Sequence, residues 1–338
     1  MLALLFLFIF LYLSFLFIRS RLEAETVTGL WNRAVFVTGC DCGFGHDIAI
    51  RLAKMGMPVF AGCLTQEGQK RLETEISNIP GAKLRAIECD VTNDESVEKM
   101  GKIVDTECQQ YGGLWAVINN AGVGHGVFLD DFLQPDDYRL TMEVNLYGMI
   151  RVVHRLRRLV KQKKGRIVNV TSILGRCPVT CIGPYIISKH AANAYTEVIR
   201  KELSIFGVDV VNIEPGFVKT TLTNVDRIKK GNEHLWNRAC TELKDEYGYE
   251  FFQKACENQA MMINSLGAEK TDNVMDAYTK AVTSAYPRRR YKVGWDTLFL
   301  WHPLTFLPTN VQDAIFCLLD RAAGAPTPAR IQMEKSKL

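Results

Sequence analysis

The chain has little excess of charge of either sign. Its 41 basic and 37 acidic residues leave a formal net charge of +4. That balance is too mild to indicate a DNA or RNA partner, because nucleic-acid-binding proteins cluster Lys and Arg against phosphates. Disorder is excluded as well, since 47% of the residues are hydrophobic and 23% are charged. A length of 338 residues suits one large α/β domain or two small ones.

The cysteines lack the spacing of a metal site. Cys40 and Cys42 are separated by a single residue, and Cys177 and Cys181 have no matching Cys or His pair nearby. No metal is therefore expected. The cysteines are interpreted as reduced thiols that pack as small hydrophobic side chains in a cytosol-facing domain, with a lumenal, disulfide-bonded protein as the alternative.

Charged residues are absent from positions 1–18, and Arg19 and Arg21 follow at once. A helix of this length would reach roughly 27 Å, which matches the thin endoplasmic-reticulum bilayer. No basic segment precedes the run and no small-residue cleavage site follows it. We therefore predict a transmembrane anchor in place of a cleaved signal peptide. The basic residues after it place the rest of the chain in the cytosol.

From residue 33 onward, strand-like runs alternate with helical segments, which predicts a Rossmann-like α/β fold with a doubly wound parallel sheet. The first strand, residues 34–37, ends in the turn Thr38-Gly39-Cys40-Asp41-Cys42-Gly43-Phe44-Gly45, and a helix is expected from Asp47 to Met55. Glycines let the backbone approach a pyrophosphate, and the helix N-terminus attracts that anion. A dinucleotide site is predicted here, and a purely structural glycine turn is the alternative.

The second predicted strand, residues 58–64, ends without the side chain that usually selects the nucleotide. An acidic residue there would bind the adenine ribose, and an arginine would accept the 2′-phosphate of NADP. Cys63, Leu64 and Thr65 do neither. The glycine turn holds no basic residue, and Asp41 would repel a 2′-phosphate that came close. NAD is therefore the predicted cofactor, with NADP as the alternative.

Polar residues follow or interrupt the next elements. Asp90, at the end of a strand over residues 84–91, is placed to accept the adenine amino group. A fourth strand, residues 114–118, runs into Asn119-Asn120-Ala121-Gly122. Asn119 is expected to tie neighbouring strands together, with a role beside the cofactor as the alternative. Asn145 lies midway along a helix predicted over residues 136–159, although asparagine is a mediocre helix former. It either has a functional role or bonds to neighbouring backbone.

Ser172 ends the fifth strand, residues 166–172, thirteen residues before Tyr185. A helix over residues 185–203 would place Lys189 one turn beyond Tyr185 on the same face. A free phenol has a pKa of about 10, and a neighbouring ammonium favours its ionised form. The two residues are thus a candidate general base. On its own, such a spacing could also be a surface contact.

In this order and spacing, the residues from 32 to 220 resemble the short-chain dehydrogenase/reductase family. The N-terminal anchor, Gly113-Leu114-Trp115 and Tyr291-x-x-Gly294-Trp295-Asp296 resemble its membrane-anchored retinol and hydroxysteroid dehydrogenase branch, with 3-hydroxybutyrate dehydrogenase close by. Cys42 departs from the usual small or hydroxylated residue of the glycine turn, but its backbone N–H still serves.

The resemblance implies a catalytic role for Tyr185, Lys189, Ser172 and Asn145. Tyr185 would exchange a proton with the substrate hydroxyl, and Lys189 would lower its pKa and hold the nicotinamide ribose. Ser172 would bind the substrate oxygen, and Asn145 would hold a water that links Lys189 to solvent. The predicted cofactor-binding residues are Thr38, Gly39, Asp41, Gly43, Phe44, Gly45, Asp90, Val91, Asn120, Ala121, Gly122, Tyr185, Lys189, Pro215, Gly216, Val218 and Thr220.

The predicted organisation is an anchor over residues 1–18, a linker over 19–31, the catalytic domain over 32–220, and a substrate lid with a C-terminal extension over 221–338. The lid prediction rests on large apolar side chains, which could also simply pack a helical extension: Trp236, Tyr247, Tyr249, Phe251, Phe252, Met261 and Met262. Residues 298–307 are apolar but broken by Pro303, so they are expected at a membrane interface or against the main domain.

The function predicted is NAD-dependent hydride transfer between a hydrophobic alcohol, retinol or hydroxysteroid, and the nicotinamide, at the endoplasmic-reticulum membrane. The alternatives are a 3-hydroxybutyrate-type dehydrogenase and a catalytically silent lipid-binding or scaffold protein. The expected partners are a lipophilic small-molecule substrate and membrane lipid, without nucleic acid, and a homodimer is an open alternative.

Overall fold

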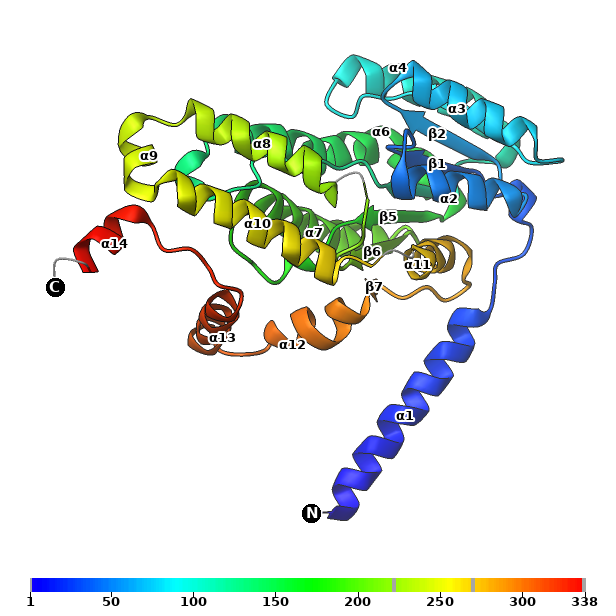
Figure 1. The fold of residues 1–338 in the computed structure, drawn as a ribbon. Coiled ribbons are helices and arrows are strands. Elements are labelled where there is room, and N and C mark those ends of the chain that lie inside the picture. Colours follow the sequence, from blue (N-terminus) through cyan, green and yellow to red (C-terminus); the bar gives the residue numbers. More distant parts are fainter. Residues whose placement is uncertain (1, 221–222, 269–270, 336–338) are drawn as a thin grey trace.

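The computed structural model describes residues 2–220, 223–268 and 271–335 (Figure 1). Within them lies a single seven-stranded sheet. Its strands are β1 Val35–Thr38, β2 Val59–Cys63, β3 Leu84–Glu88, β4 Ala116–Asn119, β5 Arg166–Val170, β6 Asp209–Pro215 and β7 Arg290–Val293. The order is β3-β2-β1-β4-β5-β6-β7, and all neighbouring pairs run parallel. The predicted doubly wound α/β fold is confirmed.

Helices join the strands and extend the chain beyond the sheet. The α-helices are α1 Leu2–Ala24, α2 Gly43–Lys54, α3 Gln66–Ser77, α4 Asp94–Cys108, α5 Pro135–Met142, α6 Met149–Lys163, α7 Gly183–Ser204, α8 Val225–Arg238, α9 Thr241–Tyr247, α10 Tyr249–Leu266, α11 Asp272–Thr283, α12 His302–Leu304, α13 Thr309–Ala322 and α14 Ala329–Lys335. Two π-helical segments, η4 Glu143–Gly148 and η7 Thr297–Trp301, precede α6 and α12. Short 3₁₀ turns are η1 Leu30–Asn32, η2 Gln109–Tyr111, η3 Asp130–Phe132 and η5 Ile173–Gly175.

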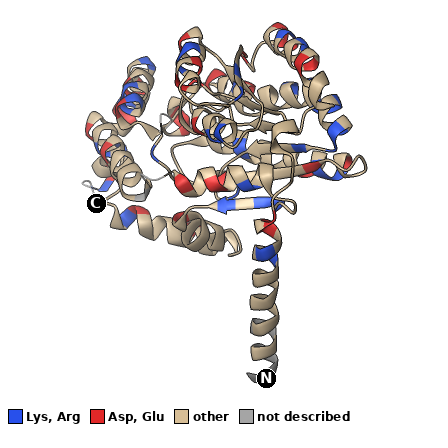
Figure 2. Cartoon of the chain, turned by 90° about the vertical axis from the view of Figure 1, so that its right-hand side faces the viewer, with Lys and Arg blue, Asp and Glu red and all other residues tan. Residues whose placement is uncertain are grey.

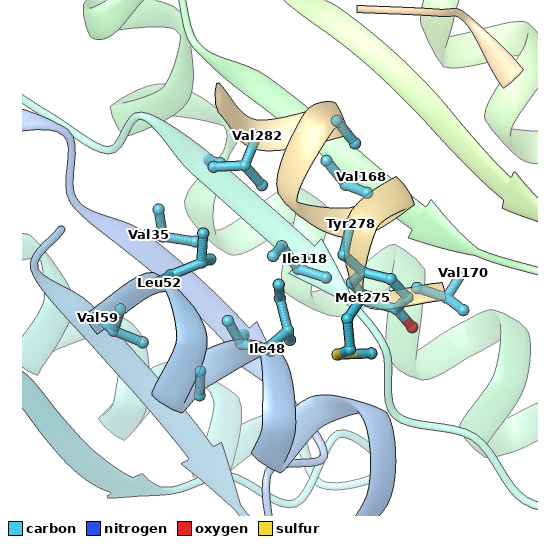
Figure 3. Close-up of a cluster of buried hydrophobic side chains, with 14 of the residues drawn as sticks. Val35, Ile48, Leu52, Val59, Ile118, Val168, Val170, Met275, Tyr278 and Val282 are labelled. Atoms are coloured by element: carbon cyan, nitrogen blue, oxygen red, sulfur yellow. The ribbon is translucent and has the colours of Figure 1, made fainter. Parts of the chain in front are cut away.

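Helices cover both faces of the sheet. Successive side chains of each strand point to opposite sides, so neighbouring residues pack against different helices. Val35 packs on one face with α2 and α11, whose Ile48 and Tyr278 are fully buried (Figure 3). Phe36, the next residue, packs on the other face with α4, α6 and α7. Continuous apolar strands are expected when helices cover both faces of a parallel sheet.

A strand and a helical segment differ from the sequence-based expectation. β7 was not predicted as a strand, because its alternate residues Arg290 and Lys292 are charged, as expected at an edge. The helix expected over residues 136–159 is continuous from α5 to α6, but it widens into η4 around Asn145. Such π turns are rare and are often found at functional sites.

The N-terminal helix α1 projects away from the body (Figure 1), and its charged residues lie near its C-terminal end (Figure 2). Phe10 and Phe17 are 65% and 67% exposed. Its last turn is tied to the body by an ion pair of 2.7 Å between Glu23 and Arg288. Among the described residues, no helix was found to be long and apolar enough to cross a membrane, so the predicted transmembrane segment is not shown.

The aromatic residues beyond position 221 mostly form a core of their own. Trp236 and Phe252, from α8 and α10, are buried against Phe128 and Phe132 of the loop after β4. The packing interpretation therefore holds for these side chains. Farther along, Trp301 and Leu304 are buried, whereas Phe299 and Phe306 are 79% and 77% exposed.

Candidate active site

The glycine turn between β1 and α2 allows a very close backbone approach. A Cβ on Gly39 would lie 2.9 Å from the Cα of Ala121, and one on Gly45 would lie 2.2 Å from the carbonyl oxygen of Gly39. Gly39 also has a φ of 70°, in the left-handed region. α2 begins at Gly43, four residues earlier than expected, so the positive end of its dipole adjoins the turn. This geometry fits the pyrophosphate of a dinucleotide.

Thr38 holds the turn against the end of β4. Its Oγ1 accepts hydrogen bonds of 3.0 Å from the backbone N–H groups of Asn120 and Ala121. Asn120 Nδ2 donates back to the Thr38 carbonyl, and its Oδ1 accepts from the Tyr278 hydroxyl at 2.8 Å. Asn119 donates to Asn169 on β5 at 2.8 Å, which confirms its structural role between strands.

Asp90 follows β3, which ends three residues earlier than expected. Its Oδ1 accepts hydrogen bonds from the backbone N–H and the hydroxyl of Thr92, at 2.9 and 2.7 Å. The carboxylate is thus fixed by its own loop and lines the cavity described below.

Asn145 is fully buried within η4 and links two catalytic elements. Its Oδ1 accepts from the N–H of Val123 at 2.8 Å, and its Nδ2 donates to the Val123 carbonyl and to Ser188 Oγ at 2.9 Å. Ser188 in turn donates to the carbonyl of Tyr185 at 2.7 Å. The backbone bonded by Asn145 is therefore distant in sequence and belongs to the loop after β4. Its three side-chain hydrogen bonds outside its own helix account for an asparagine at this position.

Ser172, Tyr185 and Lys189 come together at the end of β5. Ser172 and Tyr185 line the same cavity, and Ser172 Oγ donates to the carbonyl of Pro215 at 3.5 Å. Lys189 is 4% exposed, and its Nζ donates to the carbonyl of Val170 at 3.0 Å and lies 5.5 Å from the centre of the Tyr185 ring. Ser172 Oγ also accepts from the N–H of Leu174 at 3.1 Å.

Burial controls the protonation of both residues. It raises the pKa of Tyr185 to about 12, against a smaller lowering by the neighbouring Ser172 side chain. Burial also lowers the pKa of Lys189 to about 8. Loss of hydration therefore sets the direction of the phenol pKa in the protein alone, and its lowering by Lys189 stays a prediction. At neutral pH the phenol is protonated.

These residues line a cavity of about 520 Å³ at the carboxyl ends of the strands. It lies at the point between β1 and β4 where the strand order reverses, the usual ligand site of such sheets. The predicted residues along its wall are Gly39, Asp41, Gly43, Phe44, Asp90, Val91, Asn120, Ala121, Gly122, Ser172, Tyr185, Lys189, Pro215, Gly216, Val218 and Thr220. Thr38, Gly45 and Asn145 lie outside the wall and position it.

The cavity is also lined by residues that the sequence did not indicate, and these are called the far wall below. It includes Val127, Leu174, Val179, Ile182, Phe217, Arg227, Gln259, Met262 and Ile263. Of the aromatic residues and methionines proposed for the lid, only Met262 lines the cavity. These residues come from loops and from α8 and α10, where no spacing pattern distinguishes a side chain that faces a cavity from one that packs inside.

A dinucleotide fits the half of the cavity with the glycine turn, and the serine–tyrosine–lysine cluster adjoins the apolar half. This arrangement defines an oxidoreductase that acts on CH–OH groups. The short chain dehydrogenase family model matches residues 33–231, and the chain belongs to this family.

Curated relatives are similar to the chain over most of its length. The chain is 35% identical to "Retinol dehydrogenase 7" of Rattus norvegicus over 308 residues, covering 91% of this chain and 93% of the relative. It is 37% identical to "17-beta-hydroxysteroid dehydrogenase type 6" of Bos taurus over 295 residues, covering 87% and 90%. Both relatives are named for oxidation chemistry on lipophilic alcohols.

Solved structures share the fold. A short-chain dehydrogenase/reductase of Burkholderia phymatum in complex with NAD matches with a TM-score of 0.60 at 24% identity, over 74% of this chain and 85% of that one. An alcohol dehydrogenase of Thermococcus sibiricus complexed with 5-hydroxy-NADP matches with a TM-score of 0.51 at 26% identity, over 56% and 77%. Family members thus bind NAD or NADP, and the similarity leaves the choice of nucleotide open.

The buried ammonium yields a stability prediction. Lys189→Met should raise the free energy of unfolding at pH 7 by about 1–2 kcal/mol, because it removes the cost of burying a charge but also loses one hydrogen bond. The pKa is lower in the folded state, so the cost is fully present below about pH 8 and shrinks as pH rises toward the unfolded value of 10.5. Denaturant unfolding at pH 7 and pH 10 measures both.

Lys201→Met, on an exposed position of the same helix, is the matched control. It should change stability by less than about 0.5 kcal/mol at either pH. A Lys189→Met protein that is less stable than wild type at pH 7 would contradict the assigned cost of burial.

Proposed function

We propose that the protein is an NAD-dependent dehydrogenase of a hydrophobic alcohol, such as a retinol or a hydroxysteroid. The observation that carries this proposal is the Ser172–Tyr185–Lys189 cluster, in which Ser172 and Lys189 are buried, between a glycine turn suited to a dinucleotide and an apolar cavity wall. A silent scaffold would not need a charge buried at this position, because an unused buried ammonium only costs stability.

In the proposed reaction the alcohol carbon loses a hydride and its hydroxyl loses a proton. A bound nicotinamide supplies the hydride acceptor. The Ser172 hydroxyl stabilises the substrate oxygen as its charge develops, and Tyr185 takes the proton. Lys189 holds the nicotinamide ribose and keeps positive charge near the phenol. Reversal of these steps reduces a carbonyl compound.

Asn145 has a positioning part in this scheme. It fixes the loop after β4 to α7 through Val123 and Ser188. A hypothetical Cβ on Gly122 would lie 3.4 Å from Asn145 Oδ1 and 3.6 Å from Lys189 Nζ, so the two polar groups converge on the same small space. This convergence supports the proposed proton path from Lys189 toward solvent.

NAD is proposed over NADP because Cys63, the last residue of β2, and Leu64 after it have no cationic side chain for a 2′-phosphate. The carboxylates of Asp41 and Asp90 line the same cavity. Negative charge at this end disfavours the additional phosphate of NADP.

The substrate class follows from the far wall. Leu174, Val179, Ile182 and Met262 present apolar surface, which suits a rigid ring system or a polyene. The names of the relatives agree with this class. One observation favours the 3-hydroxybutyrate alternative: Arg227 also lines the cavity and could bind a carboxylate.

A substrate panel tests the function directly. Purified protein with NAD should oxidise retinols or hydroxysteroids with a kcat/KM at least about tenfold above that for 3-hydroxybutyrate, because the apolar wall contributes binding only to a lipophilic substrate. Formation of NADH is followed by absorbance, and each reaction is repeated with NADP. Preference for hydroxybutyrate would favour the Arg227 alternative, and no turnover of any alcohol would favour the scaffold.

Tyr185→Phe tests the mechanism. It should lower kcat/KM for the best alcohol at least about 100-fold, since no other described side chain is assigned the proton transfer. Tyr195→Phe is the matched control, because this tyrosine lies on the same helix and its hydroxyl has no hydrogen-bond partner in the described structure. It should retain wild-type turnover.

The pH dependence of the activity is a second test of proton transfer by Tyr185. Oxidation needs the phenolate, and burial raises the pKa of Tyr185 to about 12 in the protein alone, so wild-type oxidation should rise with pH. Carbonyl reduction needs the protonated phenol and should fall as pH rises. Wild-type activity in Tyr185→Phe, or a flat oxidation profile, would exclude Tyr185 as the base.

We further propose that α1 attaches the protein to the endoplasmic-reticulum membrane with the catalytic domain in the cytosol. Support comes from the exposed apolar side chains along α1, including Phe10 and Phe17, and from the exposed Phe299 and Phe306 elsewhere on the chain. A homodimer stays a prediction.

The double variant Phe10→Lys/Phe17→Lys should shift the protein from the membrane pellet to the supernatant in cell fractionation, because two charges oppose insertion of the apolar side chains. Ile205→Lys, at an 81% exposed position on the body, is the control and should stay in the pellet. Wild-type protein in the supernatant would contradict attachment.

A further inference from the structure

The end of β2 lacks an acidic residue of its own, but a carboxylate is present there. Asp41, from the turn after β1, reaches across to the segment that follows β2. Its Oδ2 accepts the N–H of Leu64 at 2.8 Å, and its Oδ1 accepts the N–H and hydroxyl of Thr65 at 2.9 and 2.7 Å. The turn after β1 thus supplies an acidic group beside the end of β2.

The sequence around α3 is adapted to this carboxylate. Thr65 caps the helix by accepting the N–H of Gly68, and a Cβ on Gly68 would lie 2.5 Å from Asp41 Oδ1. Glycine is therefore required for the carboxylate to sit against the first turn of α3.

Asp41 is in contact with the space that a nucleotide would take. Asp41 and Leu64 line the same cavity as Tyr185 and Lys189. In the described structure Oδ2 accepts one hydrogen bond, although a carboxylate oxygen can accept two. It retains the capacity to accept a hydrogen bond from a ribose hydroxyl.

A cation lies next to this carboxylate. Arg71 of α3 donates through Nη2 to the backbone carbonyl of Asp41. Its side chain is exposed, so the guanidinium is held near the ribose end of the cavity without filling it. The charge presented to a nucleotide at this position is the balance between Asp41 and Arg71.

Resting on the proposed use of a nicotinamide dinucleotide, we infer that Asp41 is the residue that selects NAD over NADP. Its carboxylate accepts a ribose hydroxyl of NAD and repels the 2′-phosphate of NADP. Arg71 is the residue that would bind the phosphate once the carboxylate is neutralised. Selectivity thus comes from the glycine turn, and β2 contributes only the backbone that orients the carboxylate.

Fluorescence titration with NADH and NADPH tests this inference without any alcohol. Wild-type protein should bind NADH at least about tenfold more tightly than NADPH, and Asp41→Asn should reduce that ratio by about tenfold or more through tighter NADPH binding. Asn keeps an oxygen for the Thr65 hydrogen bonds. Asp41→Asn/Arg71→Met should lose the gain in NADPH affinity.

Asp47→Asn is the control for charge alone, since this exposed carboxylate lies on α2 away from the cavity wall. It should leave the ratio unchanged. Equal binding of the two nucleotides by wild type, or an unchanged ratio in Asp41→Asn, would overturn the inference. If Asp41→Asn does not fold, the affinities of wild-type protein for ADP-ribose and for ADP-ribose 2′-phosphate are compared instead. Equal affinities would refute selection against the 2′-phosphate.

The outcomes separate this inference from the proposed function. Selective NADH binding without turnover of any alcohol would refute the dehydrogenase proposal and leave the role of Asp41 standing. Turnover with NAD and an unchanged ratio in Asp41→Asn would do the reverse.

Discussion

The hydrogen bond from Lys189 to the carbonyl of Val170 is the constraint on which the site depends. It joins α7 to the carboxyl end of β5, and so it fixes the distance between a residue of a helix and Ser172 of a strand end. An ammonium with little exposure needs such an acceptor, because burial without one would favour its neutral form further. Tyr185 lies on the same helix α7, and Asn145 of η4 is bonded to that helix through Ser188.

Much of this could be derived from the sequence because the relevant signals are local. Glycines in a turn, a serine at a strand end and a tyrosine one helical turn before a lysine each have a short-range physical reason. Parallel topology then brings them to one edge. By contrast, the pKa of Tyr185 depends on how many atoms surround the phenol, which no spacing reveals. The sequence pattern therefore indicates which groups are neighbours of the phenol, but it does not give the direction of the pKa shift.

The far wall could not be derived for a different reason. Trp236 and Met262 both lie on helices that mix apolar with polar residues, yet Trp236 packs inside a secondary core and Met262 lines the cavity. Which one faces inward depends on how α8 and α10 dock against the loop after β4, and that contact is between segments distant in sequence. The reach of Asp41 to Leu64 is of the same kind, because the partner of the carboxylate is a backbone group that carries no sequence signal.

The π turn at Asn145 has a consequence for how the protein can change in evolution. α5, η4 and α6 form one continuous rod, and the wide turn sets the rotation between the two halves. Each residue of a helix turns the following side chains by roughly 100°. Loss of one residue within η4 would therefore swing Val152 and Leu156 of α6 off the sheet while Asn145 moved away from Val123. Core packing and the site share one helical register, so single-residue insertions and deletions should be purged from this segment.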